Sequence, residues 1–203
     1  MEGPEDAGTV LDPLPPSTAE VRQELLRLLS SAAPSVVTGC RMRSLIERLE
    51  HSQPADLERD RALLAGVWQL RWSSSRLPYL AVAPWLENLQ LLDPDHGRGM
   101  NLLRLAGALA PVAGIAVQAE LTLAPGRDGR PSQRVGVRFL RGGWLGPRLG
   151  DRRLALMRGV NQSFPAWLDI TVLDDDLRVC RGNAGTLFAL SRRRDLSLAM
   201  FLD

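Results

Sequence analysis

From Gly66 onward the chain consists of short segments with strand character separated by clusters of turn residues, and this pattern limits the possible folds more than any other feature. The segment 66–72 alternates, which places Trp68, Leu70 and Trp72 on one face of a strand. Eight or nine such strands predict a sandwich or barrel, and we favour an antiparallel β-barrel because closure removes exposed sheet edges. The further segments, with no long helix between them, lie at about 86–92, 99–105, 115–124, 133–140, 152–157, 167–173, 176–181 and 184–191.

Turn residues at 93–97, 125–129 and 141–143 separate several of these strands, and the second of them predicts a hairpin loop. Apolar side chains share one face on either side of that loop. A barrel of about eight strands is filled by side chains or holds one small ligand, and alternation alone leaves both possibilities open. The predicted lining is Trp68, Leu70, Trp72, Leu121, Val135, Val137 and Phe139.

Two amphipathic helices are predicted ahead of the strands. The first opens at a capping box formed by Ser17 and Glu20 and ends at Pro34, and the second covers about 41–49. Their apolar stripes predict packing faces, and 56–64 predicts a short helical turn. The chain is thereby divided into a disordered tail (1–16), a helical leader (17–60), a barrel (61–195) and a C-terminal tail (196–203).

The basic residues are unevenly distributed. The chain has 203 residues with 25 arginines, no lysine and 23 acidic residues, and the composition is typical of a globular domain. Residues 1–60 carry 11 acids and 6 arginines (net −5), whereas 61–203 carry 12 acids and 19 arginines (net +7). A basic body suits an anionic membrane surface. We expect no nucleic-acid partner, because Trp68 and Trp72 alternate into an apolar face and few other aromatic residues could stack on bases.

Residues that carry catalytic chemistry are scarce. His51 and His96 are expected on the surface, Cys40 and Cys180 are expected to be packing residues, and a Walker loop needs a lysine. The run 174–176 fits a turn between strands better than a metal site. We therefore predict no catalytic residue, no metal and no cofactor, and a protein that is not an enzyme.

No targeting signal is recognisable. The acidic, proline-rich start resembles neither a secretory signal nor a transit peptide, and the apolar stretch 102–117 is too interrupted to span a bilayer. We expect a protein that is not secreted and that lies in the cytoplasm or peripherally on a membrane.

Two segments carry a family resemblance. Residues 63–75, with Gly66 and Trp68 as Gly-x-Trp, resemble the opening strand of the plastid-lipid-associated proteins, the plastid fibrillins. Residues 167–190 look like that family's terminal hairpin, and the resemblance covers roughly 38–191. Val172 and Trp72 stand where the family usually has tyrosine. The matching positions in the hairpin are Asp169, Asp174, Asp176, Arg178, Arg181 and Gly182.

The resemblance implies a lipocalin-like barrel of a cyanobacterial-type member, with no import step and a place on the cytoplasmic side of the thylakoid membrane. It implies binding of a hydrophobic small molecule or lipid, such as a prenylquinone, carotenoid or glycerolipid, while any protein partner remains unknown. Two alternatives stay open. One is a peripheral scaffold with a filled barrel, which an exposed apolar patch at 77–85 would support, and the other is a lipocalin-like bilin lyase.

The same resemblance leads to expectations for the hairpin. Arg178 or Arg181 should face the Trp68 ring in a cation–π contact. The three aspartates at 169, 174 and 176 should pair with these arginines or cap the turn. The Gly182-Asn183 step should supply the positive-φ residues of a tight turn.

Overall fold

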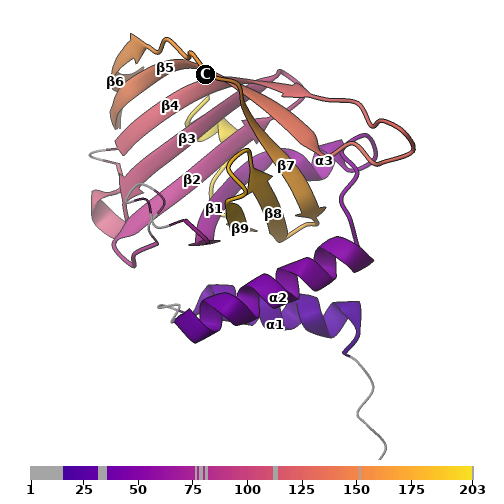
Figure 1. Cartoon of the computed structure of the whole chain (residues 1–203). Coiled ribbons are helices and arrows are strands. Elements are labelled where there is room, and N and C mark those ends of the chain that lie inside the picture. Colours follow the sequence, from indigo (N-terminus) through magenta and orange to yellow (C-terminus); the bar gives the residue numbers. More distant parts are fainter. Residues whose placement is uncertain are drawn as a thin grey trace, which may run out of the picture.

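A computed structural model describes residues 16–31, 36–75, 77, 80, 82–111, 114–150 and 152–202. Within these residues two N-terminal helices precede a closed antiparallel β-barrel of eight strands with one extra strand (Figure 1). The mainly β fold predicted from the alternating pattern is therefore confirmed. The predicted tail lies almost entirely outside the described residues. The helices are α1 (Thr18–Ser30), α2 (Val36–Ser52) and the short α3 (Arg61–Leu64).

The barrel closes between its first and last strands. Its order is β1–β2–β3–β4–β5–β7–β8–β9, with β9 pairing back onto β1 and every pair antiparallel. The extra strand β6 pairs with the second half of β5, so that this part of the sheet extends beyond the closed wall (Figure 1). The strands are β1 (Gly66–Ser73), β2 (Leu86–Asp93), β3 (Arg98–Leu105), β4 (Gly114–Leu123), β5 (Arg134–Leu149), β6 (Arg152–Gly159), β7 (Ala166–Leu173), β8 (Leu177–Gly182) and β9 (Leu187–Arg192).

The prediction of a turn at 141–143 is wrong, because β5 runs straight through it. Gly142 pairs with Val117 on one side and with Arg158 on the other, so both edges of this stretch are hydrogen-bonded. A side chain on Gly143 would collide with the Leu156 carbonyl. The glycine therefore permits close approach of the strands and does not mark a turn.

The register of β1 explains a second difference from the sequence prediction. The pairing of β1 with β9 shifts between Leu70 and Trp72, which marks a β-bulge. One extra residue reverses the faces that follow it. Trp68 and Leu70 thus lie in the barrel interior, whereas Trp72 packs outside it among the helices.

Helices α1 and α2 cover the outer face of the β7–β9 and β1 wall (Figure 1). The capping box of Ser17 and Glu20 is present, and the predicted packing stripes are confirmed. The segment expected to be a C-terminal tail instead packs on the outer face of β1–β5, where Phe201 is buried. The buried stripe residues of the helices are Val21, Leu25, Leu29, Met42, Leu45, Ile46 and Leu49.

The two hairpin predictions have different outcomes. The loop 125–129 does join paired strands, with Asp128 at φ 52° and Gly129 at φ 71°. In the β8–β9 turn, however, the positive-φ residue is Gly185 (φ 74°), so the assignment to Gly182-Asn183 is wrong. Gly182 still belongs to β8, and its N–H donates to the Thr186 carbonyl at 2.9 Å.

Candidate functional site

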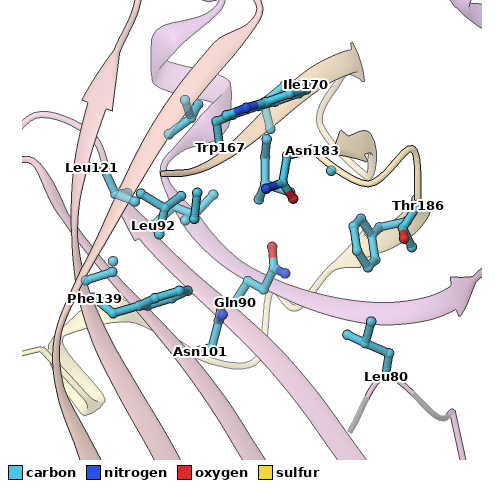
Figure 2. A pocket seen from close by; sticks show the side chains of 18 of the residues that line it. Leu80, Gln90, Leu92, Asn101, Leu121, Phe139, Trp167, Ile170, Asn183 and Thr186 are labelled. Atoms are coloured by element: carbon cyan, nitrogen blue, oxygen red, sulfur yellow. The ribbon is translucent and has the colours of Figure 1, made fainter. Parts of the chain in front are cut away.

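Part of the barrel interior is hollow, next to the packed core residues. A cavity of about 430 Å³ lies inside it, within the range of about 300–1,000 Å³ typical of small-molecule sites. Alternate residues of the strands form its wall, because successive side chains in a strand point to opposite faces. Figure 2 shows these side chains arranged around a common space. The wall includes Gln90 and Leu92 of β2, Asn101 of β3, Ala119 and Leu121 of β4, Val135, Val137 and Phe139 of β5, Leu168 and Ile170 of β7, and Phe188 of β9.

The structure separates the seven residues predicted as lining into three groups. Leu121 and the three β5 residues border the cavity. Trp68 and Leu70 belong to the packed interior without bordering it, and Trp72 lies outside the barrel. The lining residues from β2, β3 and β7 were not predicted from the sequence. These strands do alternate with a period of two. In β2, however, leucine occurs on both faces, so alternation cannot show which face is interior.

The packed end of the barrel is built around Trp68. Its indole N–H donates to the Leu64 carbonyl at 3.0 Å, and the guanidinium of Arg192 lies 4.2 Å from the ring centroid. Arg192 also donates to the carbonyls of Asp175 at 2.6 Å and Ala65 at 2.7 Å, and to that of Leu63. Arg192 therefore fastens the strand ends to the segment before β1, a role that the sequence analysis did not assign.

Arg178 also faces Trp68, as predicted, with its guanidinium carbon 5.2 Å from the ring centroid. It borders the cavity and is fully buried. One nitrogen, Nη2, donates to the side-chain oxygen of Gln90. Among the described residues, Nε and Nη1 have no hydrogen-bond partner. Burial lowers the pKa of Arg178 and raises that of the neighbouring Cys180 thiol.

Of the other motif positions in the hairpin, Gly182 borders the cavity, whereas Arg181 and Asp169 do not. Arg181 lies on the outer face and forms an ion pair with Glu50 of α2 at 2.5 Å, so it does not face Trp68. Asp169 pairs with Arg134, not with Arg178 or Arg181. The first ion pair joins α2 to β8, and the second joins β5 to β7.

The acidic run forms a turn between β7 and β8. Asp174 accepts hydrogen bonds from the backbone N–H groups of Asp176 (2.8 Å) and Leu177 (2.9 Å), as expected of a turn cap. It also pairs with Arg22 of α1, and Asp176 pairs with Arg194. The predicted arginine partners are thus replaced by others that the fold brings near.

An exposed apolar strip extends from the cavity wall along the sheet. Across β4, β5 and β6, Ile115, Trp144 and Leu156 are cross-strand neighbours. Alternation places Ile115 on the same face as Ala119 and Leu121, which border the cavity. Ile115 is 63% exposed and Leu156 73% exposed. We call these residues, with Leu154 and Val160, the apolar ledge.

The remaining candidates carry no recognisable site. His51 and His96 are exposed as predicted, and His96 Nδ1 lies 2.8 Å from an Asp93 oxygen. Cys180 is buried, but Cys40 is exposed and is not the packing residue that we expected.

The patch at 77–85 lies partly outside the described residues, although Trp85 within it is 64% exposed. No helix in the described part of the chain is long and apolar enough to cross a membrane.

Comparison with protein-family models matches residues 147–191 to the PAP_fibrillin family. The match runs from the end of β5 through β9 and includes the hairpin with Arg178, but not the Gly-x-Trp strand. It supports similarity to the fibrillins over less than a quarter of the chain. Neither the curated proteins nor the solved structures contain a significant match.

Proposed function

We propose that this protein is a fibrillin-type, non-catalytic binder of lipids or isoprenoids, such as a prenylquinone, carotenoid or glycerolipid. The observation that carries the proposal is the cavity of about 430 Å³, whose wall is mainly apolar and is rich in leucine, valine and phenylalanine side chains. Transfer of an apolar chain into such a space contributes about 25 cal/mol per Å² removed from water. The match to PAP_fibrillin supports a lipid-associated role.

The proposed place of action is a membrane surface, which the family resemblance suggests is the cytoplasmic side of a thylakoid. The apolar ledge provides side chains that could enter the interfacial region of a bilayer. Arg158 lies on the same face of β6 as Leu156 and is exposed, so it would meet anionic headgroups. A lipid could then pass between membrane and cavity without crossing water.

The test is to purify the protein from its natural membrane background and identify bound molecules by solvent extraction and mass spectrometry. We expect a stoichiometric lipid or isoprenoid. Ala119→Phe, which places a ring in the cavity, should remove it. Ala155→Phe adds the same ring on an exposed position of β6 and should leave the ligand in place.

Two results would contradict the proposal. A protein free of ligand that still floats with liposomes would indicate a scaffold. A covalent adduct after incubation with a bilin and its acceptor protein would indicate a lyase.

A further inference from the structure

The deep part of the cavity holds a cation for which the described residues provide no counter-ion. Arg178 is fully buried, and none of the described residues that border the cavity is acidic. Gln90 satisfies one guanidinium nitrogen and the Cys180 thiol interacts with the same group, while Nε and Nη1 have no hydrogen-bond partner among the described residues. Arginine keeps its charge in proteins, and a buried charge that is left unpaired is costly. Such an arrangement is stable only if something compensates the cost.

Contact with the Trp68 ring does not explain why an arginine is buried at position 178. Arg192 already lies closer to that ring, at 4.2 Å against 5.2 Å, and satisfies its own donors on three carbonyls. The site also differs from a structural ion pair such as Arg181 with Glu50, in which both partners belong to the protein. Arg178 instead borders the cavity, with its guanidinium fully buried in the wall.

The place of Arg178 in the cavity wall determines how a bound molecule would be oriented. It lies near Trp68 and the packed end of the barrel, whereas Leu80, Asn183 and Thr186 come from loops at the other end of the strands (Figure 2). Between these ends the wall is almost entirely apolar. A guest that satisfies both regions has a small acceptor headgroup at the deep end and an apolar chain directed toward the loops.

We propose that Arg178 binds the carboxylate of a single-chain lipid acid, held head-inward in the barrel. This inference rests on the proposed function and narrows its ligand class. A carboxylate is small enough to reach the deep end, supplies the missing charge and accepts from two guanidinium N–H groups. The side-chain amides of Gln90 and Asn101, which also border the cavity, provide further polar contacts.

The test uses two probes that differ only in the headgroup, dodecanoate and dodecan-1-ol. Binding is measured by displacement of Nile red, a neutral fluorophore. We expect the wild-type protein to bind the acid more tightly than the alcohol. Arg178→Met should weaken acid binding by roughly 10- to 100-fold, the range expected for charge-assisted hydrogen bonds, and leave alcohol binding unchanged. Arg181→Met, on the outer face of the same strand, is the matched control.

A second chain type identifies the source of the carboxylate. Dodecanoate represents fatty acids and farnesoate represents isoprenoid acids, and preference for either over its alcohol supports the assignment. Arg178→Lys retains the charge and should keep much of that preference, so the test does not depend on how the methionine variant folds.

The outcomes separate the two proposals. If wild-type protein binds acid and alcohol equally, or Arg178→Met keeps the preference, the headgroup assignment is wrong while lipid binding stands. If neither Nile red nor any lipid probe binds, the proposed function itself fails.

Discussion

Two arginines with opposite surroundings meet at one tryptophan. Arg192 donates to three carbonyls and belongs to the framework, whereas Arg178 has two nitrogens without partners among the described residues. Contact with the same tryptophan therefore does not tell what each charged side chain contributes. The hydrogen-bond partners of each guanidinium do, because an unsatisfied buried donor lowers stability and a satisfied one does not.

The two arginines should respond differently to the same substitution. Arg192→Met leaves carbonyls of Leu63, Ala65 and Asp175 without their donor, and we expect it to lower the free energy of unfolding by about 1–3 kcal/mol. Arg178→Met removes an unpaired charge from an apolar site and should leave the ligand-free protein unchanged or more stable. Urea unfolding of both variants after delipidation checks this. Equal destabilisation would show that Arg178 is also part of the framework.

At the scale of elements, the helical layer is joined to the barrel by ion pairs around its apolar contact. Arg22 of α1 holds Asp174 in the β7–β8 turn, with Nε–Oδ2 at 2.6 Å. Burial opposes ionisation of Asp174, but the hydrogen bonds from Arg22 and from the backbone N–H groups of Asp176 and Leu177 outweigh it and lower its pKa. The turn and the helix are thus coupled through one carboxylate.

This coupling predicts acid sensitivity. Because the folded pKa of Asp174 lies below its ordinary value of 3.8, its contribution is present above about pH 4 and is lost as the pH falls through the folded pKa. Asp174→Asn should cost about 1–3 kcal/mol at pH 7, and its difference from wild type should shrink below about pH 4. Unfolding free energies measured between pH 7 and pH 2.5 check the prediction. A difference that does not change with pH would show that the charge makes no contribution.

At the scale of the whole molecule, the helices, the C-terminal segment and the apolar ledge occupy different parts of the sheet surface. The helices cover β7–β9 and β1, and the C-terminal segment covers the outer face of β1–β5. The ledge, on the inner face of β4–β6, stays exposed. The covered faces belong to the hydrophobic core, and the exposed one is the surface that we propose to meet a membrane.

Membrane binding should depend on this ledge. Leu156→Asp should strongly reduce flotation with liposomes that contain anionic lipid, because it places a charge where an apolar side chain would insert. Arg158→Gln should reduce binding about fivefold at low salt, with a smaller effect at high salt. Val37→Asp is the control, since Val37 is 79% exposed but lies on α2. Equal loss in the control would contradict docking through the ledge.

Local pattern in the sequence was sufficient to predict the helices, the approximate positions of the strands and the mainly β class, because periodicities of 3.6 and 2 directly report which side chains share a face. It also placed Leu121, Val135, Val137 and Phe139 together. The resemblance of the terminal hairpin directed attention to Arg178. These features depend on neighbours along the chain.

Only the tertiary structure decided which faces meet. A single bulge moved Trp72 from the barrel to the helices, and strand pairing on both edges turned 141–143 from a predicted turn into part of β5. The arginine partners, the hollow interior and the unpaired donors of Arg178 depend on contacts between residues far apart in the sequence. Alternation assigns a side chain to one side of a strand, whereas register and closure determine what lies opposite it and how much space remains.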